Sequence, residues 1–197
     1  MNIPNVMNNF PRLETDRFIL RSIRLDDAES IFQIFSDDEV TKFYDVASFT
    51  SIDQARELIE QNLERFARGE GIRWAIARKE DDILVGTCGY NNLYKVSRRG
   101  VIGYDLAQAY WGKGIITEAL RAMIQYGFEG LGLNRIEALV MLENLASMNA
   151  LRKLGFQEEG ILREYAFWKD QFVDLKCFSL LRREYMKVMQ PYPTTAV

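Results

Sequence analysis

The sequence predicts one α/β domain built around a mixed sheet. The 197 residues are 48% hydrophobic, which is enough for one well-packed core and a tight fit for two. Strand-like and helix-like patterns alternate along the chain. One strand–helix–strand unit near the middle predicts a parallel pair, because a crossover helix joins parallel neighbours, while hairpins make other pairs antiparallel.

The first predicted elements are a strand and an amphipathic helix. Residues 17–23 alternate apolar and polar side chains, as a half-buried strand does. Asp26 and Glu29 have the spacing of a capping box, and apolar residues then recur on one helical face as far as Phe35. A short helix over residues 37–43 is expected to follow.

The next stretch predicts a longer helix and a hairpin. Ser51 and Gln54 form a second capping-box pattern, and the helix that they open is expected to end at Gly69. Residues 72–76 and 83–90 have strand patterns separated by a polar turn. This arrangement favours an antiparallel hairpin.

The central region predicts the strand–helix–strand unit. A strand over residues 101–107 leads into a glycine-rich turn, a helical pattern over residues 120–131 and a strand over residues 135–141. The two strands are therefore expected to be parallel. A further helix over residues 145–154 is expected to end at Gly155, because glycine adopts the left-handed conformation of a helix cap.

Two antiparallel strands over residues 159–168 and 172–181 are expected to complete the sheet. The domain is predicted to span residues 13–185. Residues 1–12 and 186–197 are predicted to be flexible tails, because chain ends without a docking element are usually poorly ordered.

Composition excludes several functional classes. The chain has no histidine, which rules out Ser-His-Asp and Cys-His catalysis and histidine-ligated zinc, and no metal is expected. A net charge of -3 and a pI near 5.2 argue against nucleic-acid binding. No apolar run approaches the roughly 18 residues of a membrane span. Cys88 and Cys177 lack paired spacing and no signal-peptide pattern is present, which favours buried thiols in a reducing cytoplasm.

The turn that contains Gly112 and Gly114 carries the strongest functional signal. A glycine-rich turn leading into a helix presents unpaired N–H groups and the positive end of the helix dipole, a combination that binds phosphate. A Walker loop would need Ser or Thr at Gly114, and a dinucleotide fingerprint would need a small residue at Thr117. The alternative is a plain strand-to-helix turn.

A second polar cluster begins the helix over residues 145–154. Asn144 is a natural N-cap, and the simplest expectation is that Asn144 and Ser147 satisfy backbone donors. Together with the glycine turn, the order of motifs resembles the GNAT N-acetyltransferase superfamily. The resemblance to its RimJ/RimL branch, N-terminal acetyltransferases of ribosomal proteins and relatives, extends over nearly the whole chain. The motifs that carry it are Leu13-Glu14-Thr15-Asp16-Arg17, Ile102-Gly103-Tyr104, Trp111-Gly112-Lys113-Gly114, Thr117-Glu118-Ala119, Glu159-Gly160-Ile161-Leu162-Arg163-Glu164 and Ser179-Leu180-Leu181.

The resemblance implies a mostly antiparallel mixed sheet with helices on both faces, splayed between its fourth and fifth strands, with acetyl-CoA as cosubstrate in the opening. Asn144 is expected to contact the pantetheine amides. Ile116 departs from the family, which usually has Gly or Ala there, and a β-branched side chain limits close approach of phosphate. The backbone expected to pair with the pantetheine arm is that of Tyr104, Asp105, Leu106 and Ala107. The amides expected to hold the diphosphate are those of Trp111, Gly112, Lys113, Gly114, Ile115, Ile116 and Thr117.

Acetyl transfer needs a neutral amine, a polarised thioester carbonyl and a proton for the departing thiolate. A strand N–H near Leu106 is expected to stabilise the oxyanion, because strand divergence leaves such groups unpaired. Many superfamily members have a tyrosine as proton donor where this chain has Leu151. Ser147, a serine common in the branch, is therefore predicted to donate the proton or to hold a water. The predicted base is Glu164, and the alternatives are Asp105, Glu137, water and the substrate itself.

The sequence thus predicts a cytoplasmic, acetyl-CoA-dependent N-acetyltransferase with direct transfer to a primary amine, either a protein N-terminus or a small molecule. An alternative from another functional class is a module that binds or senses acyl-CoA without catalysis. A third possibility is an enzyme that uses a different acyl donor. The identity of the acceptor and the formation of a homodimer stay open. The aromatic residues expected either to line the acceptor slot or to pack in the core are Tyr44, Tyr90, Tyr94, Trp168 and Phe172.

Overall fold

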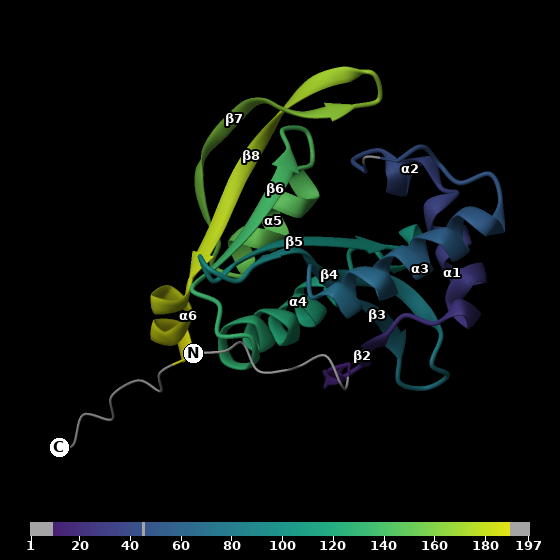
Figure 1. Cartoon of the computed structure of the whole chain (residues 1–197), viewed down its shortest axis with the longest axis horizontal. Helices are drawn as coiled ribbons and strands as arrows, with labels where there is room; N and C mark the ends of the chain where they lie inside the picture. The colour runs from purple at the N-terminus through teal and green to yellow at the C-terminus, as the bar shows by residue number, and fades with distance from the viewer. Residues whose placement is uncertain (1–9, 45, 190–197) are drawn as a thin grey trace.

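An eight-stranded mixed sheet forms the centre of the computed structural model, which describes residues 10–44 and 46–189 (Figure 1). The strand order is β1-β2-β3-β4-β5-β6-β8-β7, and all neighbours are antiparallel except β5 and β6. The strands are β1 (Leu13–Glu14), β2 (Phe18–Ser22), β3 (Ile72–Arg78), β4 (Leu84–Tyr94), β5 (Arg99–Leu106), β6 (Arg135–Met141), β7 (Gln157–Trp168) and β8 (Gln171–Leu181). The helices are η2 (Leu25–Asp27), α1 (Ala28–Phe35), α2 (Asp38–Thr41), α3 (Ile52–Arg68), η3 (Gln108–Tyr110), α4 (Ile115–Gln125), η4 (Tyr126–Gly130), α5 (Leu145–Lys153) and α6 (Arg182–Met189). The predicted mixed, mostly antiparallel sheet is confirmed.

Two helices, α3 and α5, end at the glycines that the sequence predicted, and α3 begins with the predicted capping box. At the start of α3, Ser51 N–H donates to Gln54 Oε1 at 3.1 Å, so the predicted capping box is present. Gly69 ends α3 with φ of +67°, and Gly155 follows α5 with φ of +86°. Both values lie in the left-handed region that glycine adopts without a Cβ clash, which explains why these helices end there.

The capping box predicted for Asp26 and Glu29 is wrong. The neighbouring Asp27 carboxylate instead accepts from Arg24 N–H at 2.8 Å and from both terminal nitrogens of Arg21, each at 2.8 Å. A bidentate arginine–carboxylate pair is stronger than a neutral hydrogen bond to a backbone amide. The arginine on β2 therefore decides which carboxylate holds the start of this helical segment.

Residues at the N-terminal end pack against the core although the sequence placed them in a tail. Pro11 O accepts from the indole N–H of Trp74 at 2.7 Å. The ring centroids of Phe10 and Phe66 lie 4.8 Å apart. These contacts fix the segment before β1, a strand that the sequence analysis did not predict.

At the C-terminal end, β8 leads into α6, a second element that was not predicted. This helix continues to Met189, beyond the predicted domain limit at residue 185. The remaining parts of the predicted tails, residues 1–9 and 190–197, lie outside the described residues. The domain limits therefore stay a prediction.

Helices cover both faces of the sheet, as predicted. Trp74 and Ile76 of β3 belong to a hydrophobic cluster with side chains of α4 and α5, whereas Ala75 belongs to a second cluster with side chains of α1 and α3. Successive side chains of a strand point to opposite faces. All three are fully buried, so each face of β3 is covered by helices.

The parallel strands β5 and β6 separate along their length. Residues 99–102 of β5 pair with residues 135–138 of β6, and within the described chain this pairing stops there. Residues 103–106 remain paired with β4, while β6 stays paired with β8 as far as Met141. Figure 1 shows β6 turning away from β5 toward the β7–β8 hairpin. The splay expected between the strands over residues 101–107 and 135–141 is confirmed.

Candidate active site

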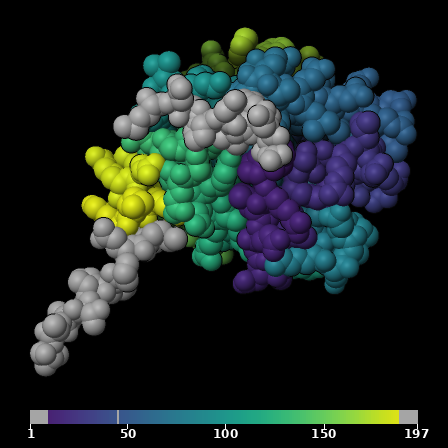
Figure 2. All heavy atoms as spheres, turned by 60° about the horizontal axis from the view of Figure 1, so that its bottom comes forward, coloured from purple at the N-terminus to yellow at the C-terminus, as the bar shows by residue number. Residues whose placement is uncertain are grey.

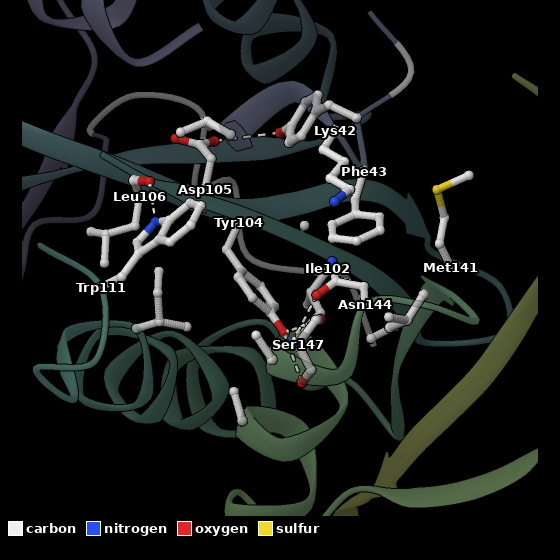
Figure 3. Close-up of a pocket in the computed structure, with 18 of the residues that line it drawn as sticks. Lys42, Phe43, Ile102, Tyr104, Asp105, Leu106, Trp111, Met141, Asn144 and Ser147 are labelled. Atoms are coloured by element: carbon white, nitrogen blue, oxygen red, sulfur yellow. Dashed lines mark hydrogen bonds between the residues drawn. The ribbon is translucent and has the colours of Figure 1, made fainter. Parts of the chain in front are cut away.

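A cavity of about 700 Å³ lies where β5 and β6 separate (Figure 3). It is lined from both faces of the sheet, because Tyr104 and Ile116 pack with the cluster of α4 and Val40 packs with the cluster of α1. The cavity therefore passes through the plane of the sheet. Of the predicted site residues, Ala107 and Glu164 lie outside it. Those that line it are Tyr104, Asp105, Leu106, Trp111, Gly112, Lys113, Gly114, Ile115, Ile116, Thr117, Asn144 and Ser147.

The turn before α4 has the geometry of an anion-binding loop. Gly112 and Gly114 have φ of +73° and +72°, which only glycine adopts readily. Glu118 N–H donates to Gly114 O at 3.1 Å, so the N–H groups of residues 115–117 precede the first bond of the helix. Because these residues line the cavity, the positive end of the α4 dipole borders it.

Two residues of this turn are engaged within the protein. Trp111 N–H, predicted to hold diphosphate, donates to Gln108 O at 3.1 Å, which corrects that assignment. The Trp111 indole N–H donates to Leu106 O at 2.7 Å, and Lys113 Nζ donates to Ala109 O at 2.8 Å. The backbone amides that follow Trp111, rather than these two side chains, offer the anion-binding groups.

The edge of β5 supplies the second set of backbone groups. Ala107 N–H donates to Val85 O at 2.9 Å, so it faces β4 and is not available to a ligand. This bond, and its position outside the cavity, correct the prediction for Ala107. Peptide groups alternate in direction along a strand, so the N–H groups of Leu106 and Tyr104 point to the other side, where β6 has turned away.

The start of α5 brings two hydroxyl groups together. Ser147 N–H donates to Asn144 Oδ1 at 3.0 Å, so Asn144 is the predicted N-cap. Ser147 Oγ and Tyr104 Oη lie 2.6 Å apart, within hydrogen-bonding distance, and Figure 3 shows Tyr104 reaching from β5 to Ser147. Burial raises the pKa of Tyr104 to about 12, although the Ser147 hydrogen bond opposes the shift. This hydroxyl pair, Tyr104 and Ser147, is therefore protonated at neutral pH.

The sequence analysis did not assign a role to the Tyr104 side chain. The two residues are separated by the whole of α4 and β6, so no local spacing pattern connects them. Leu151, the position at which the resemblance led us to look for a tyrosine, is fully buried in the core. Tyr104 of β5 thus places a phenol beside Ser147 of α5, whereas the expected tyrosine would have come from α5 itself.

Two of the predicted base candidates are held in ion pairs. The Asp105 side chain is 1% exposed and lies 2.7 Å from Arg73 Nη2, and it also accepts from the Thr87 hydroxyl at 2.6 Å. Glu137 Oε1 accepts from Arg135 Nε at 2.6 Å and lies outside the cavity. Both carboxylates are therefore engaged by arginine side chains of the protein.

Glu164 lies away from the cavity. It sits in a bulge of β7, where three residues intervene between Leu162 and Ala166 while the partner strand has one, and its φ is +48°. Its N–H donates to Asp174 Oδ1 at 2.8 Å, and the residue is exposed in a separate shallow hollow. The bulge turns Glu164 outward, so we no longer propose it as the base.

The cavity has two distinct halves. The glycine-turn half consists of residues 104–106, the turn over residues 112–117, and Asn144 with Ser147. The hairpin half is formed by α2 with the residues after it, the end of β6, and the tip of the β7–β8 hairpin, where Lys169 Nζ donates to Thr41 O at 3.4 Å. Side chains of the hairpin half include Glu39, Val40, Lys42, Phe43, Tyr44, Met141, Ala166, Phe167, Trp168 and Leu175.

The aromatic residues singled out in the sequence divide between the cavity and other places. Tyr44 and Trp168 line the hairpin half. Tyr90 is 1% exposed and belongs to the core. Tyr94 lies under the guanidinium of Arg99, and Phe172 packs edge-on against another ring of the hairpin. Two of the five therefore contribute to the cavity wall.

Further findings concern the described residues, 10–44 and 46–189. That part of the chain contains no group of three or more acidic or cysteine side chains that could hold a metal ion. None of its helices is long and apolar enough to cross a membrane. Cys88 and Cys177 are buried and free, and burial raises the pKa of Cys88 to about 12, which keeps it a thiol.

Comparisons with known proteins agree with this geometry. A family model described as Acetyltransferase (GNAT) domain matches residues 17–157. The uncharacterized N-acetyltransferase p20 of Bacillus licheniformis is 44% identical over 173 residues, which cover 88% of this chain and 97% of that protein. The ribosomal-protein-serine acetyltransferase of Escherichia coli is 28% identical over 129 residues, covering 66% and 71%. Mycobacterium smegmatis RimJ, solved with CoA-disulfide, superposes with a TM-score of 0.81 at 23% identity, covering 91% of this chain and 90% of that one.

The chain therefore belongs to the GNAT acetyltransferase family, and its relatives include a ribosomal-protein-serine acetyltransferase. The family assignment and the acyltransferase class predicted from the sequence are confirmed, with acetyl-CoA as the family's cosubstrate. The cavity fits such a cosubstrate, because it combines an anion-binding turn with an unpaired strand edge.

Proposed function

We propose that this protein transfers an acetyl group directly from acetyl-CoA to the primary amine at the N-terminus of a peptide or protein, in the cytoplasm. The observation that carries the proposal is the cavity through the sheet, with backbone donors in one half and an apolar, aromatic wall in the other. The donor occupies the glycine-turn half, where N–H groups hold the diphosphate and the edge of β5 pairs with the pantetheine arm. The acceptor enters through the hairpin half.

Charge balance in the hairpin half favours a peptide over a polyamine. Glu39 and Asp105 are the carboxylates of the cavity wall, and Asp105 is already neutralised by Arg73. Lys42 lines the same half, so the local charge is close to zero. A polycation would gain little there, whereas one ammonium group attached to a short apolar chain matches one carboxylate among aromatic rings. The ribosomal-protein-serine acetyltransferase among the relatives supports the same class of acceptor.

The proposed reaction assigns each proton to a group on the cavity wall. The neutral amine attacks the thioester carbonyl carbon, and the N–H groups of Tyr104 and Leu106 that face the opening stabilise the oxyanion. When the C–S bond breaks, the thiolate takes a proton from the hydroxyl pair, Tyr104 and Ser147. The proton of the amine leaves to water, with Glu39 as the carboxylate that attracts the ammonium form of the acceptor.

Mass spectrometry of the products tests this proposal. The protein is incubated with acetyl-CoA and a panel of peptides with free N-termini, polyamines, amino acids and aminoglycosides, while CoA release is followed. We expect CoA release with peptides and a mass increase at the N-terminal amine. Acetylation of small amines alone would overturn the choice of acceptor, and CoA binding without product from any amine would favour the acyl-CoA-binding alternative. Parallel reactions with propionyl-CoA and succinyl-CoA test the choice of acyl donor.

A further inference from the structure

Two motifs of the sequence, Leu13 to Arg17 and Thr117 to Ala119, are about 100 positions apart and meet beside the glycine turn. Figure 2 shows the N-terminal strands against α4, with the two segments in contact on the surface. We propose that Thr15, Arg17 and Glu118 form a clamp that holds the turn over residues 112–117 in its diphosphate-binding conformation. The proposal rests on the proposed use of acetyl-CoA and assigns positioning roles to these three residues.

The Glu118 carboxylate is the centre of this clamp. Its Oε1 accepts from the Thr15 hydroxyl at 2.6 Å and from Arg17 N–H at 2.9 Å. Its Oε2 accepts from Arg17 Nε at 2.7 Å, and Arg17 Nη2 also lies 2.7 Å away. Both oxygens are thus bonded to the segment between β1 and β2, which fixes the first turn of α4 against the N-terminal strands.

Arg17 extends the clamp to the glycine turn itself. Its Nη2 donates to Lys113 O at 3.1 Å, so one guanidinium contacts residues on both sides of Gly114. Among the described residues, a Cβ added at Gly112 would meet no atom within 4 Å, and one added at Gly114 would meet only Arg17 Nη2 at 4.0 Å. Side-chain packing therefore leaves this turn loose at its glycines. The Arg17 hydrogen bond to Lys113 O restrains the backbone between the two glycines, which lowers the conformational entropy lost when the diphosphate binds.

The charges of the clamp also suit an anion. A carboxylate in the first turn of α4 would repel a diphosphate bound at the same helix end. Burial opposes the charge of Glu118, but hydrogen bonds from Thr15 and Arg17 lower its pKa below the ordinary value. Glu118 is therefore ionised at neutral pH, and the guanidinium of Arg17 cancels its charge next to the anion site.

The clamp is tested by comparing two acetyl donors, acetyl-CoA and S-acetylpantetheine, which lacks the diphosphate and the nucleotide. We expect Arg17→Met to raise the Kd for CoA, measured by calorimetry, and the KM for acetyl-CoA by about tenfold, with kcat little changed. The KM for S-acetylpantetheine is expected to stay within about twofold of the wild-type value. Thr15→Val and Glu118→Gln are expected to shift the same donor preference in the same direction.

A matched control is Arg12→Met, which removes an exposed ion pair with Glu14 on the same β1 segment and leaves the turn untouched. It is expected to bind CoA as the wild type does. If Arg17→Met binds CoA like this control, or weakens both donors equally, the clamp proposal is wrong. If the wild type itself fails to bind CoA, the proposed function fails as well, so the two failures are distinguishable without any acceptor. A melting temperature for each variant identifies a general loss of folding.

Discussion

The two halves of the cavity are built in different ways. The glycine-turn half consists of backbone groups and side chains from one stretch of the chain, namely the end of β5, the turn before α4 and the start of α5. The hairpin half is assembled from α2 and the tip of β7–β8, which are joined by a hydrogen bond from Lys169 to Thr41 O, 128 positions apart in the sequence. The glycine-turn half is therefore fixed by the fold, whereas the hairpin half can change its side chains without disturbing the sheet.

The largest effect is expected from the hydroxyl pair in the glycine-turn half. Tyr104→Phe and Ser147→Ala remove the proton source for the thiolate, so each is expected to lower kcat by about 100-fold, and the double variant by little more. The KM for acetyl-CoA and the melting temperature are expected to stay close to the wild-type values. Steady-state kinetics with a fixed peptide acceptor measures this, and an unchanged kcat in Tyr104→Phe contradicts the assignment.

The pH dependence of the same reaction has a defined sign. Because the pKa of Tyr104 is raised to about 12, the protonated, proton-donating form persists through the alkaline range. The kcat of the wild type is therefore expected to show no decline from Tyr104 ionisation below about pH 11. A loss of kcat centred near the ordinary pKa of tyrosine, absent in Tyr104→Phe, would show that the phenol is less buried than this structure has it.

The next effect tests the backbone of the glycine turn. Gly114→Val places a β-branched residue at φ of +72°, a conformation that costs about 1–2 kcal/mol for residues other than glycine. We expect about a tenfold loss of affinity for CoA in calorimetry with an unchanged KM for the acceptor. Gly114→Asn is the matched control, because asparagine tolerates the left-handed region, and it is expected to retain most of the affinity.

A smaller effect is expected in the hairpin half. Trp168→Ala removes an aromatic side chain from the cavity wall and is expected to raise the KM for a peptide acceptor about three- to tenfold, while the Kd for CoA stays the same. Phe172→Ala, an exposed ring of the same hairpin outside the cavity, is its control. Equal effects of the two variants would mean that the hairpin acts through its stability rather than through contact with the acceptor.

The smallest effect is expected outside both halves. Glu164→Gln changes an exposed carboxylate that faces away from the cavity, so kcat, KM and their pH dependence are expected to match the wild type. A kcat that falls more than about tenfold in initial-rate measurements would indicate that Glu164 acts in catalysis. The β7–β8 hairpin would then have to rearrange when substrates bind.

The features that could be predicted from the sequence are those that depend on short stretches of the chain. The seven predicted strands, the βαβ unit, the glycine turn and the Asn144 cap follow from periodicity and capping over short windows, and each is present. The pairing of Tyr104 with Ser147 was not predictable in this way, because a hydrogen bond between side chains of different elements leaves no periodic signal. The ion pairs of the alternative base candidates were not predictable either, because Arg73, the partner of Asp105, and Arg99, a partner of Glu137, lie on other strands.

The errors over Glu164 and Asp26 have a common physical origin. Glu164 lies inside a β-bulge, where its φ of +48° departs from strand geometry, so the strand pattern could not predict which way its side chain points. Asp26 and Asp27 are adjacent carboxylates, and only the arginine brought by β2 distinguishes them. In both cases the deciding contact belongs to the tertiary structure.

Because the cavity passes through the sheet, it affects the order in which the two substrates bind. In the proposed reaction, the donor and the acceptor enter the cavity from the two faces of the sheet, because the cavity wall combines side chains from the clusters on both faces. Acetyl-CoA and the acceptor can therefore be bound at the same time, so the reaction needs no covalent acyl-enzyme intermediate between two half-reactions. We expect initial-rate plots to intersect, as they do for enzymes whose two substrates are bound together.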